Sequence, residues 1–150
     1  MKSKSGIIIL VTLVGLLTAC GGSPVTMKNI LVYPDAKEIA QSDSQLFDGV
    51  SKLAKNDTTL QFVLSAKEKK IYRLPNNVAW TDVRFFYEKN LDDSEWQLIP
   101  PTTALLERVN LPNDISSYNA EMWTRGNQTV AIAEVNSPQY VELFVGLTSP

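Results

Sequence analysis

The stretch that decides the fold is Tyr118–Glu134, which reads YNAEMWTRGNQTVAIAE. Apolar and polar residues alternate along Tyr118–Arg125 and again along Thr129–Glu134. Successive side chains of a β-strand point to opposite faces of its sheet, so this alternation is typical of strands. Gly126 and Asn127 stand between the two runs and favour a tight reversal. The stretch therefore predicts an antiparallel hairpin.

Further segments outside this hairpin are also predicted to be strands. Their residues are mostly apolar, aromatic or β-branched, and turn-forming residues bound them. They are an edge strand at Asn29–Tyr33 that Pro34 and Asp35 interrupt before Ala36–Ala40, then Thr59–Ala66, Lys69–Leu74, Trp96–Ile99 and Tyr140–Leu147. We expect Thr59–Ala66 and Lys69–Leu74 to form a second hairpin around Ala66–Glu68.

The main helix is expected at Val78–Leu91. Steps of 100° per residue gather its large side chains on one stripe, made of Ala79, Val83, Phe86, Tyr87 and Leu91. Charged residues occupy the opposite face, and Phe85 falls among them. A shorter helix is expected within Ser42–Asn56, where apolar residues recur at helical spacing although Gly49 weakens the helix.

These elements predict an α+β fold with one domain over residues 29–150. Strands joined by short turns pair antiparallel, and an amphipathic helix buries its apolar stripe against a sheet. We therefore expect an antiparallel β-sheet with one main helix packed on a face.

The first twenty residues have the pattern of an export signal. Lys2 and Lys4 precede the apolar run Ile7–Leu17, which is shorter than the roughly 20 residues that a membrane-spanning helix needs. Directly after it, Leu17-Thr18-Ala19-Cys20 resembles the lipobox of bacterial lipoproteins. The alternative is a plain secretory signal with a cysteine at its cleavage site.

The lipobox resemblance implies a lipid anchor on Cys20. In that family the cysteine sulfur receives diacylglycerol, residues 1–19 are removed as a signal peptide, and the new amino terminus is often acylated. Two or three acyl chains anchor a protein durably, whereas one holds it only marginally. Residues 20–28 would then be the lipidated cysteine and a flexible tether. The expected location is the cell envelope, on the extracytoplasmic side of the cytoplasmic membrane, or the outer membrane where the organism has one.

A second resemblance covers the domain itself. Tyr33-Pro34-Asp35-Ala36, Phe86-Tyr87 with Leu91, and Trp96 together resemble a pattern of uncharacterised exported bacterial proteins. Those proteins carry Tyr-Pro-Gly-Ala, a helix ending in Phe-Tyr, and Gly-Trp at the start of a strand. Asp35 and Glu95 stand where that pattern has glycine. The resemblance implies an antiparallel sheet with a helix and no known activity, and Tyr87 and Trp96 are expected to pin that helix to the following strand.

The residue types exclude several kinds of chemistry. The chain has no His and one Cys, which is committed to lipid, so Ser-His and Cys-His catalysis and thiolate metal sites are excluded. The acidic cluster Asp92, Asp93 and Glu95 lacks the spacing of a calcium loop, and we expect a solvated turn there. No catalytic residue, metal or cofactor is therefore predicted.

The charge pattern argues against nucleic acid as a partner. Loss of Lys2 and Lys4 with the leader leaves 12 of the 14 basic residues against 16 acidic ones, a net charge of −4. The basic run Lys67, Lys69 and Lys70 is expected to be a solvated strand edge rather than a phosphate-binding surface.

Three hypotheses about function follow. The first is a non-enzymatic envelope module that binds another protein or a cell-wall component through the outward aromatics Trp80, Phe85 and Trp123. The second is a carrier of a small apolar ligand, which requires a cavity of hundreds of Å³ between helix and sheet. The third is a hydrolase that uses carboxylates alone, which requires two of them facing each other in a cleft.

Overall fold

A computed structural model describes residues 23–92, 95–100 and 111–148. The expected signal peptide, the lipobox with Cys20, and Asp93 of the acidic cluster lie outside these residues. None of the helices in the described ranges is long and apolar enough to cross a bilayer.

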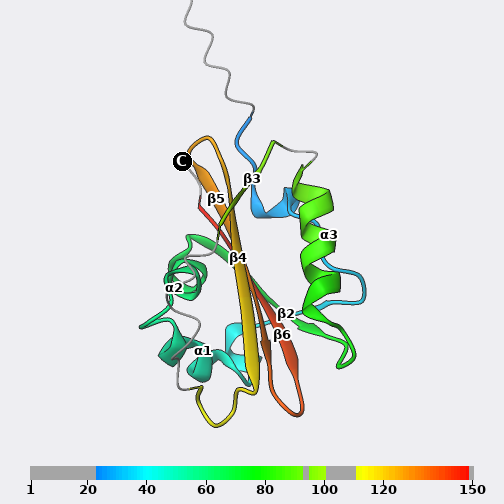
Figure 1. Cartoon of the computed structure of the whole chain (residues 1–150), viewed down its shortest axis with the longest axis vertical. Coiled ribbons are helices and arrows are strands. Elements are labelled where there is room, and N and C mark those ends of the chain that lie inside the picture. Colours follow the sequence, from blue (N-terminus) through cyan, green and yellow to red (C-terminus); the bar gives the residue numbers. More distant parts are fainter. Residues whose placement is uncertain (1–22, 93–94, 101–110, 149–150) are drawn as a thin grey trace, which may run out of the picture.

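The domain is built on one antiparallel sheet of six strands in the order β1-β2-β6-β5-β4-β3 (Figure 1). The strands are β1 (Lys37–Ile39), β2 (Glu68–Leu74), β3 (Gln97–Ile99), β4 (Ser117–Arg125), β5 (Gln128–Asn136) and β6 (Val141–Leu147). The predicted hairpin is confirmed as β4 and β5, with Arg125 paired to Gln128. Gly126 makes the reversal at φ 60°, a left-handed conformation that costs glycine nothing. The predicted α+β class is thus confirmed.

Helices cover both faces of this sheet. The chain forms α1 (Phe47–Leu53), α2 (Thr58–Ser65) and α3 (Trp80–Asp92), with short 3₁₀ turns at Met27–Asn29 and Gln41–Asp43. Figure 1 shows α3 on one side of the sheet and α1 with α2 on the other. The expected main helix on a face is α3, and the second covered face is an addition that the sequence did not predict.

Each face of the sheet has its own apolar core, because alternate residues of the central strands point to opposite sides. On β5, Val130 and Ile132 belong to the core under α3, while Ala131 and Ala133 belong to the core under α1 and α2. The α3 core also holds Tyr87, Trp96 and Trp123. One cysteine cannot form a disulfide within the chain, so the stability of the domain depends on the apolar surface buried on both faces of the sheet.

The predicted strand Thr59–Ala66 is wrong, because this segment is α2, and the hairpin expected around Ala66–Glu68 is absent with it. The Asp57 side chain caps α2 by accepting a 2.8 Å hydrogen bond from the Leu60 amide. Leu60 and Val63, three residues apart, are buried against the sheet. The Asp57 cap and the packing of Leu60 and Val63 against the sheet thus outweigh the preference of this segment's side chains for a strand.

The predicted edge strand is wrong over Asn29–Tyr33 but confirmed within Ala36–Ala40, where the edge strand β1 lies. Met27–Asn29 forms a 3₁₀ turn, and the edge strand β1 begins only at Lys37. The helix expected within Ser42–Asn56 is confirmed in its second half as α1.

The predicted apolar stripe of α3 is confirmed except at Ala79. Val83, Tyr87 and Leu91 are buried, and Phe86 is half-buried. Ala79 is exposed, contrary to the expectation, because α3 begins after it at Trp80.

The segment expected to be a tether is docked on the domain from Val25 onward. Gln128, at the start of β5, donates to the Val25 carbonyl at 2.6 Å and accepts from the Val25 amide at 2.8 Å. The Met27 amide donates to a Glu68 carboxylate oxygen at 3.0 Å, and the Met27 side chain is buried. The described chain therefore starts against one end of the sheet.

Among the described residues, two other than glycine adopt a left-handed backbone, Asp35 at φ 60° and Glu95 at φ 62°. These are the two positions at which the exported-protein pattern carries glycine. Glycine adopts this conformation without the steric cost that a side chain brings. The backbone at both turns thus has the shape that glycine would favour.

Candidate functional site

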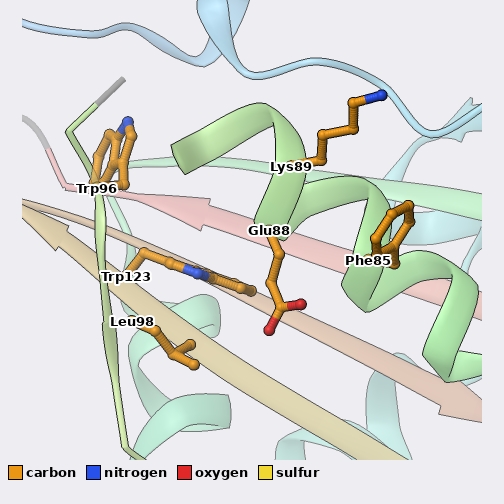
Figure 2. Close-up of a pocket in the computed structure, with 6 residues that line it drawn as sticks. All are labelled: Phe85, Glu88, Lys89, Trp96, Leu98 and Trp123. Atoms are coloured by element: carbon orange, nitrogen blue, oxygen red, sulfur yellow. The ribbon is translucent and has the colours of Figure 1, made fainter. Parts of the chain in front are cut away.

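A surface groove of about 400 Å³ lies between α3 and the sheet edge formed by β3 and β4. Phe85, Glu88 and Lys89 of α3 line it, together with Trp96, Leu98 and Trp123 on the sheet side, and Figure 2 shows Glu88 pointing toward Trp123 and Leu98. Pairing of Leu98 with Trp123 in the β3–β4 register places these two side chains together. The groove thus offers aromatic and aliphatic surface with one acid and one base beside it.

The predicted interaction residues are only partly brought together. Phe85 is 68% exposed, as expected, and lines the groove. Trp123 also lines it but is only 3% exposed, so the expectation that it faces outward is wrong. Both faces of β4 are covered, so the alternation along this strand does not separate core from solvent. Trp80 is half-buried, packs against the α3 core and is not among the groove's described lining residues.

Sequence reasoning missed the contribution of β3. Trp96 was expected to pack as an anchor and is indeed buried, but its place beside Leu98 in a groove was not foreseen. No local pattern gives this result, because it depends on the pairing of β3 with β4 across the intervening chain. Glu88 and Lys89 belong to the charged face of the helix, for which the sequence predicted no binding role.

Arg84 links the groove's acidic side chain to a buried carboxylate. Its guanidinium lies 2.9 Å from Glu88 Oε1 and 3.1 Å from Glu121 Oε1. Glu121, on β4, is 9% exposed, and its Oε2 is buried without a hydrogen-bond partner. Burial raises the pKa of Glu121, and the charge of Arg84 opposes this rise.

Glu134 is a second buried carboxyl on the same face of the sheet. It is 1% exposed, Asn136 donates to its Oε1 at 3.0 Å, and its Oε2 has no partner. Burial raises the pKa of Glu134, and the Asn136 hydrogen bond opposes the rise. Neither Glu121 nor Glu134 is among the residues that line the groove, so these carboxyls do not form the open catalytic pair that the hydrolase hypothesis requires.

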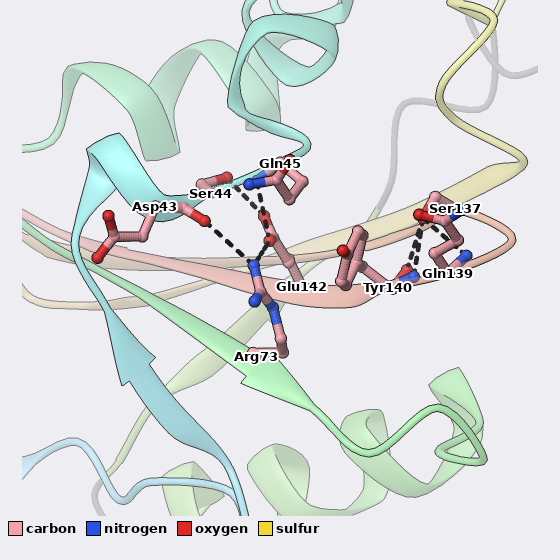
Figure 3. A network of polar contacts seen from close by, with 8 residues as sticks. All are labelled: Asp43, Ser44, Gln45, Arg73, Ser137, Gln139, Tyr140 and Glu142. Atoms are coloured by element: carbon pink, nitrogen blue, oxygen red, sulfur yellow. Dashed lines mark hydrogen bonds and ion pairs between the residues drawn. The ribbon is translucent and has the colours of Figure 1, made fainter.

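A polar network holds the chain before α1 against the sheet (Figure 3). The fully buried Glu142 of β6 accepts hydrogen bonds from the Ser44 hydroxyl, the Gln45 amide and Arg73, the last at 2.8 Å. The Arg73 guanidinium also lies 4.6 Å from the Tyr140 ring centroid. Each Glu142 oxygen is thus satisfied within the protein, which marks the network as structural.

A smaller depression of about 260 Å³ opens next to this network. Its described lining includes Gln45, Asp114, Ser137, Gln139 and Tyr140. Most of these residues are exposed, whereas the α3–β3 groove has a floor of two buried tryptophans. The groove is therefore the stronger candidate for binding.

The described residues contain no group of three or more acidic, His or Cys side chains able to hold a metal. Glu95, from the expected acidic turn, is exposed. The described lining of the groove can supply apolar contact, ring stacking and charge recognition. Comparison of the chain with protein families, with characterised proteins and with solved structures found no match.

Proposed function

We propose that this chain is a membrane-anchored bacterial lipoprotein whose domain is a non-enzymatic binding module of the cell envelope. The lipobox-like residues Leu17–Cys20 after a short apolar run support the anchor. The α3–β3 groove, with its exposed Phe85, is the single observation that carries the binding role.

The occupant we propose is an extended apolar segment of another envelope protein. β3 is the last strand of the sheet, and among the described residues it pairs only with β4. An extended peptide can add to such an edge while its side chains enter an adjacent pocket. Phe85, Trp96 and Trp123 provide the aromatic surface on which protein interfaces concentrate their binding energy.

The binding role is tested by site-specific photocrosslinking in intact cells. A photoreactive residue replaces Lys89 at the rim of the groove, and the same chain is made with Phe85→Ala or with Leu31→Ala. Leu31 is a matched control, because it is also a large exposed apolar side chain, 54% exposed, but does not line the groove. We expect one protein adduct that F85A removes and L31A leaves intact.

Purified proteins then test the groove directly. Once the adduct is identified by mass spectrometry, F85A should weaken binding of that protein by about tenfold or more, because a central aromatic side chain is lost. An adduct that is insensitive to F85A would contradict the proposal, and so would crosslinks to glycan alone.

The alternative, a carrier of a small apolar ligand, is favoured by the volume of the groove, which lies in the range of small-molecule sites. Its position at the surface, between α3 and a sheet edge, differs from the interior cavity expected from sequence. A lipid or other small molecule crosslinked at position 89, with no protein adduct, would establish this alternative instead.

A further inference from the structure

The docked start of the domain restricts where a lipid on Cys20 can lie. Three peptide units separate Cys20 from Ser23, so their Cα atoms are at most about 11 Å apart. From Val25 onward the backbone is fixed to Gln128 by the two hydrogen bonds described above. The end of the sheet that carries Gln128 must therefore stay close to the anchor.

Several chain segments meet at this end of the sheet. Glu68 at the start of β2 pairs with Leu147 at the end of β6, and Arg125 at the end of β4 pairs with Gln128 at the start of β5. Gln128 also donates to the Thr148 carbonyl at 3.4 Å. Figure 1 shows the start of the described chain, the β4–β5 turn and β3 gathered at the top of the molecule.

Positive charge is concentrated in these segments although the mature chain is acidic. They carry Lys28, Lys67, Lys69 and Arg125, of which the three lysines are exposed. Two acidic side chains are described in the same segments: Glu95, and Glu68, which accepts a hydrogen bond from the Met27 amide. In these segments the four described basic side chains thus outnumber the two described acidic ones, in a protein whose expected net charge is negative.

We propose that this end of the domain faces the membrane, with Lys28, Lys67, Lys69 and Arg125 against anionic lipid headgroups. The proposal rests on the lipid anchor of the proposed function. A short tether keeps these side chains near the bilayer, and the attraction between charges and an anionic surface is strong only within about one Debye length, roughly 8–10 Å. The β5–β6 turn, at the other end of the long strands, then points away from the membrane.

The experiment compares two exposed positions in turns at opposite ends of β5. Asn127→Cys lies in the β4–β5 turn and Gln139→Cys in the β5–β6 turn, and both residues are exposed. The sulfur of Cys20 is blocked in the lipidated chain, so each variant takes one thiol-reactive fluorophore. The labelled, lipidated proteins are reconstituted in phosphatidylcholine vesicles with or without phosphatidylglycerol, and headgroups carrying nitroxide quench the fluorophore.

We expect quenching at position 127 to exceed quenching at position 139 by about threefold or more in anionic vesicles, because both the tether and the charges favour that end. Charge reversal in K67E/K69E should bring the ratio closer to one. K52E/K55E is the matched control, since Lys52 and Lys55 are exposed lysines of and just after α1, and it should leave the ratio unchanged. A flexible Gly-Ser insertion after Gly22 should also lower the ratio, because it lengthens the tether.

Three failures can be told apart. A mass that shows Cys20 without lipid would overturn both the anchor and the orientation. A lipidated protein with equal quenching at the two positions would overturn the orientation while leaving the anchor intact. A high ratio that K67E/K69E does not change would overturn the contact of these lysines with anionic headgroups.

Discussion

Replacing Glu95 by glycine should stabilise this domain, although glycine usually destabilises. Glu95 is exposed and adopts φ 62° just before β3. A left-handed backbone costs a residue with a side chain about 1–2 kcal/mol, whereas the extra freedom of glycine in the unfolded chain costs about 0.4–1 kcal/mol. The difference predicts a gain of about 0.5–1 kcal/mol for E95G. Asp35→Gly at φ 60° should give less, because aspartate tolerates this conformation better.

Ala40→Gly is the control for this prediction. Ala40 is also exposed but has φ −69°, so glycine relieves no strain there and should cost about 0.4–1 kcal/mol. The three variants are compared with the parent by urea unfolding followed by tryptophan fluorescence. If E95G lost stability to the same extent as A40G, the argument from backbone conformation would be refuted.

The remaining predictions concern packing and buried charge. Gly146→Ala should destabilise by about 1–3 kcal/mol in urea unfolding, because the added methyl would lie 2.9 Å from Val63 Cα of α2; an unchanged midpoint would mean that α2 does not pack there. Glu142→Gln should cost about 2 kcal/mol at pH 7, since it weakens an ion pair whose acidic partner is fully buried, and a double-mutant cycle with Arg73→Met measures the coupling. Glu134→Gln should stabilise by about 1 kcal/mol at pH 8, because the raised pKa means that folding disfavours the ionised carboxyl. That gain should fade as the pH falls through the raised pKa of the folded state toward about 4.5, and it should be absent below that pH, where the parent carboxyl is protonated in both states; a gain independent of pH would contradict the assignment.

The sequence predicted correctly those parts of the fold that depend only on the order of neighbouring residues. Gly126 marks the β4–β5 reversal, and the helical spacing of Val83 and Tyr87 marks the buried stripe of α3. The misassigned segment α2 depends on other information. Its side chains suit a strand, and it is helical because Asp57 caps it and because Gly146 lets it approach the sheet closely.

The candidate site was less predictable than the fold, because it combines elements that are distant in the chain. Phe85 stood out as an apolar residue on a charged helix face, a signal that depends on one helix alone. Trp123 could not be placed, since alternation along β4 assigns it to one face but does not tell which faces are covered. Leu98 joins the groove only through the pairing of β3 with β4, which no local signal reveals.

The position of the groove constrains the partner that we propose. Because helices cover both faces of the sheet, a partner can reach its backbone only at an edge, and β3 is the edge beside the groove. Lys89 lies in the last turn of α3 and Trp96 just before β3, at the same end of the domain as Arg125. If that end rests on the membrane, the groove opens close to the lipid surface, and a partner segment must approach near the headgroups. Integral or lipid-anchored envelope proteins meet this condition directly, so the protein captured at position 89 should fractionate with membranes even in cells that lack the lipoprotein.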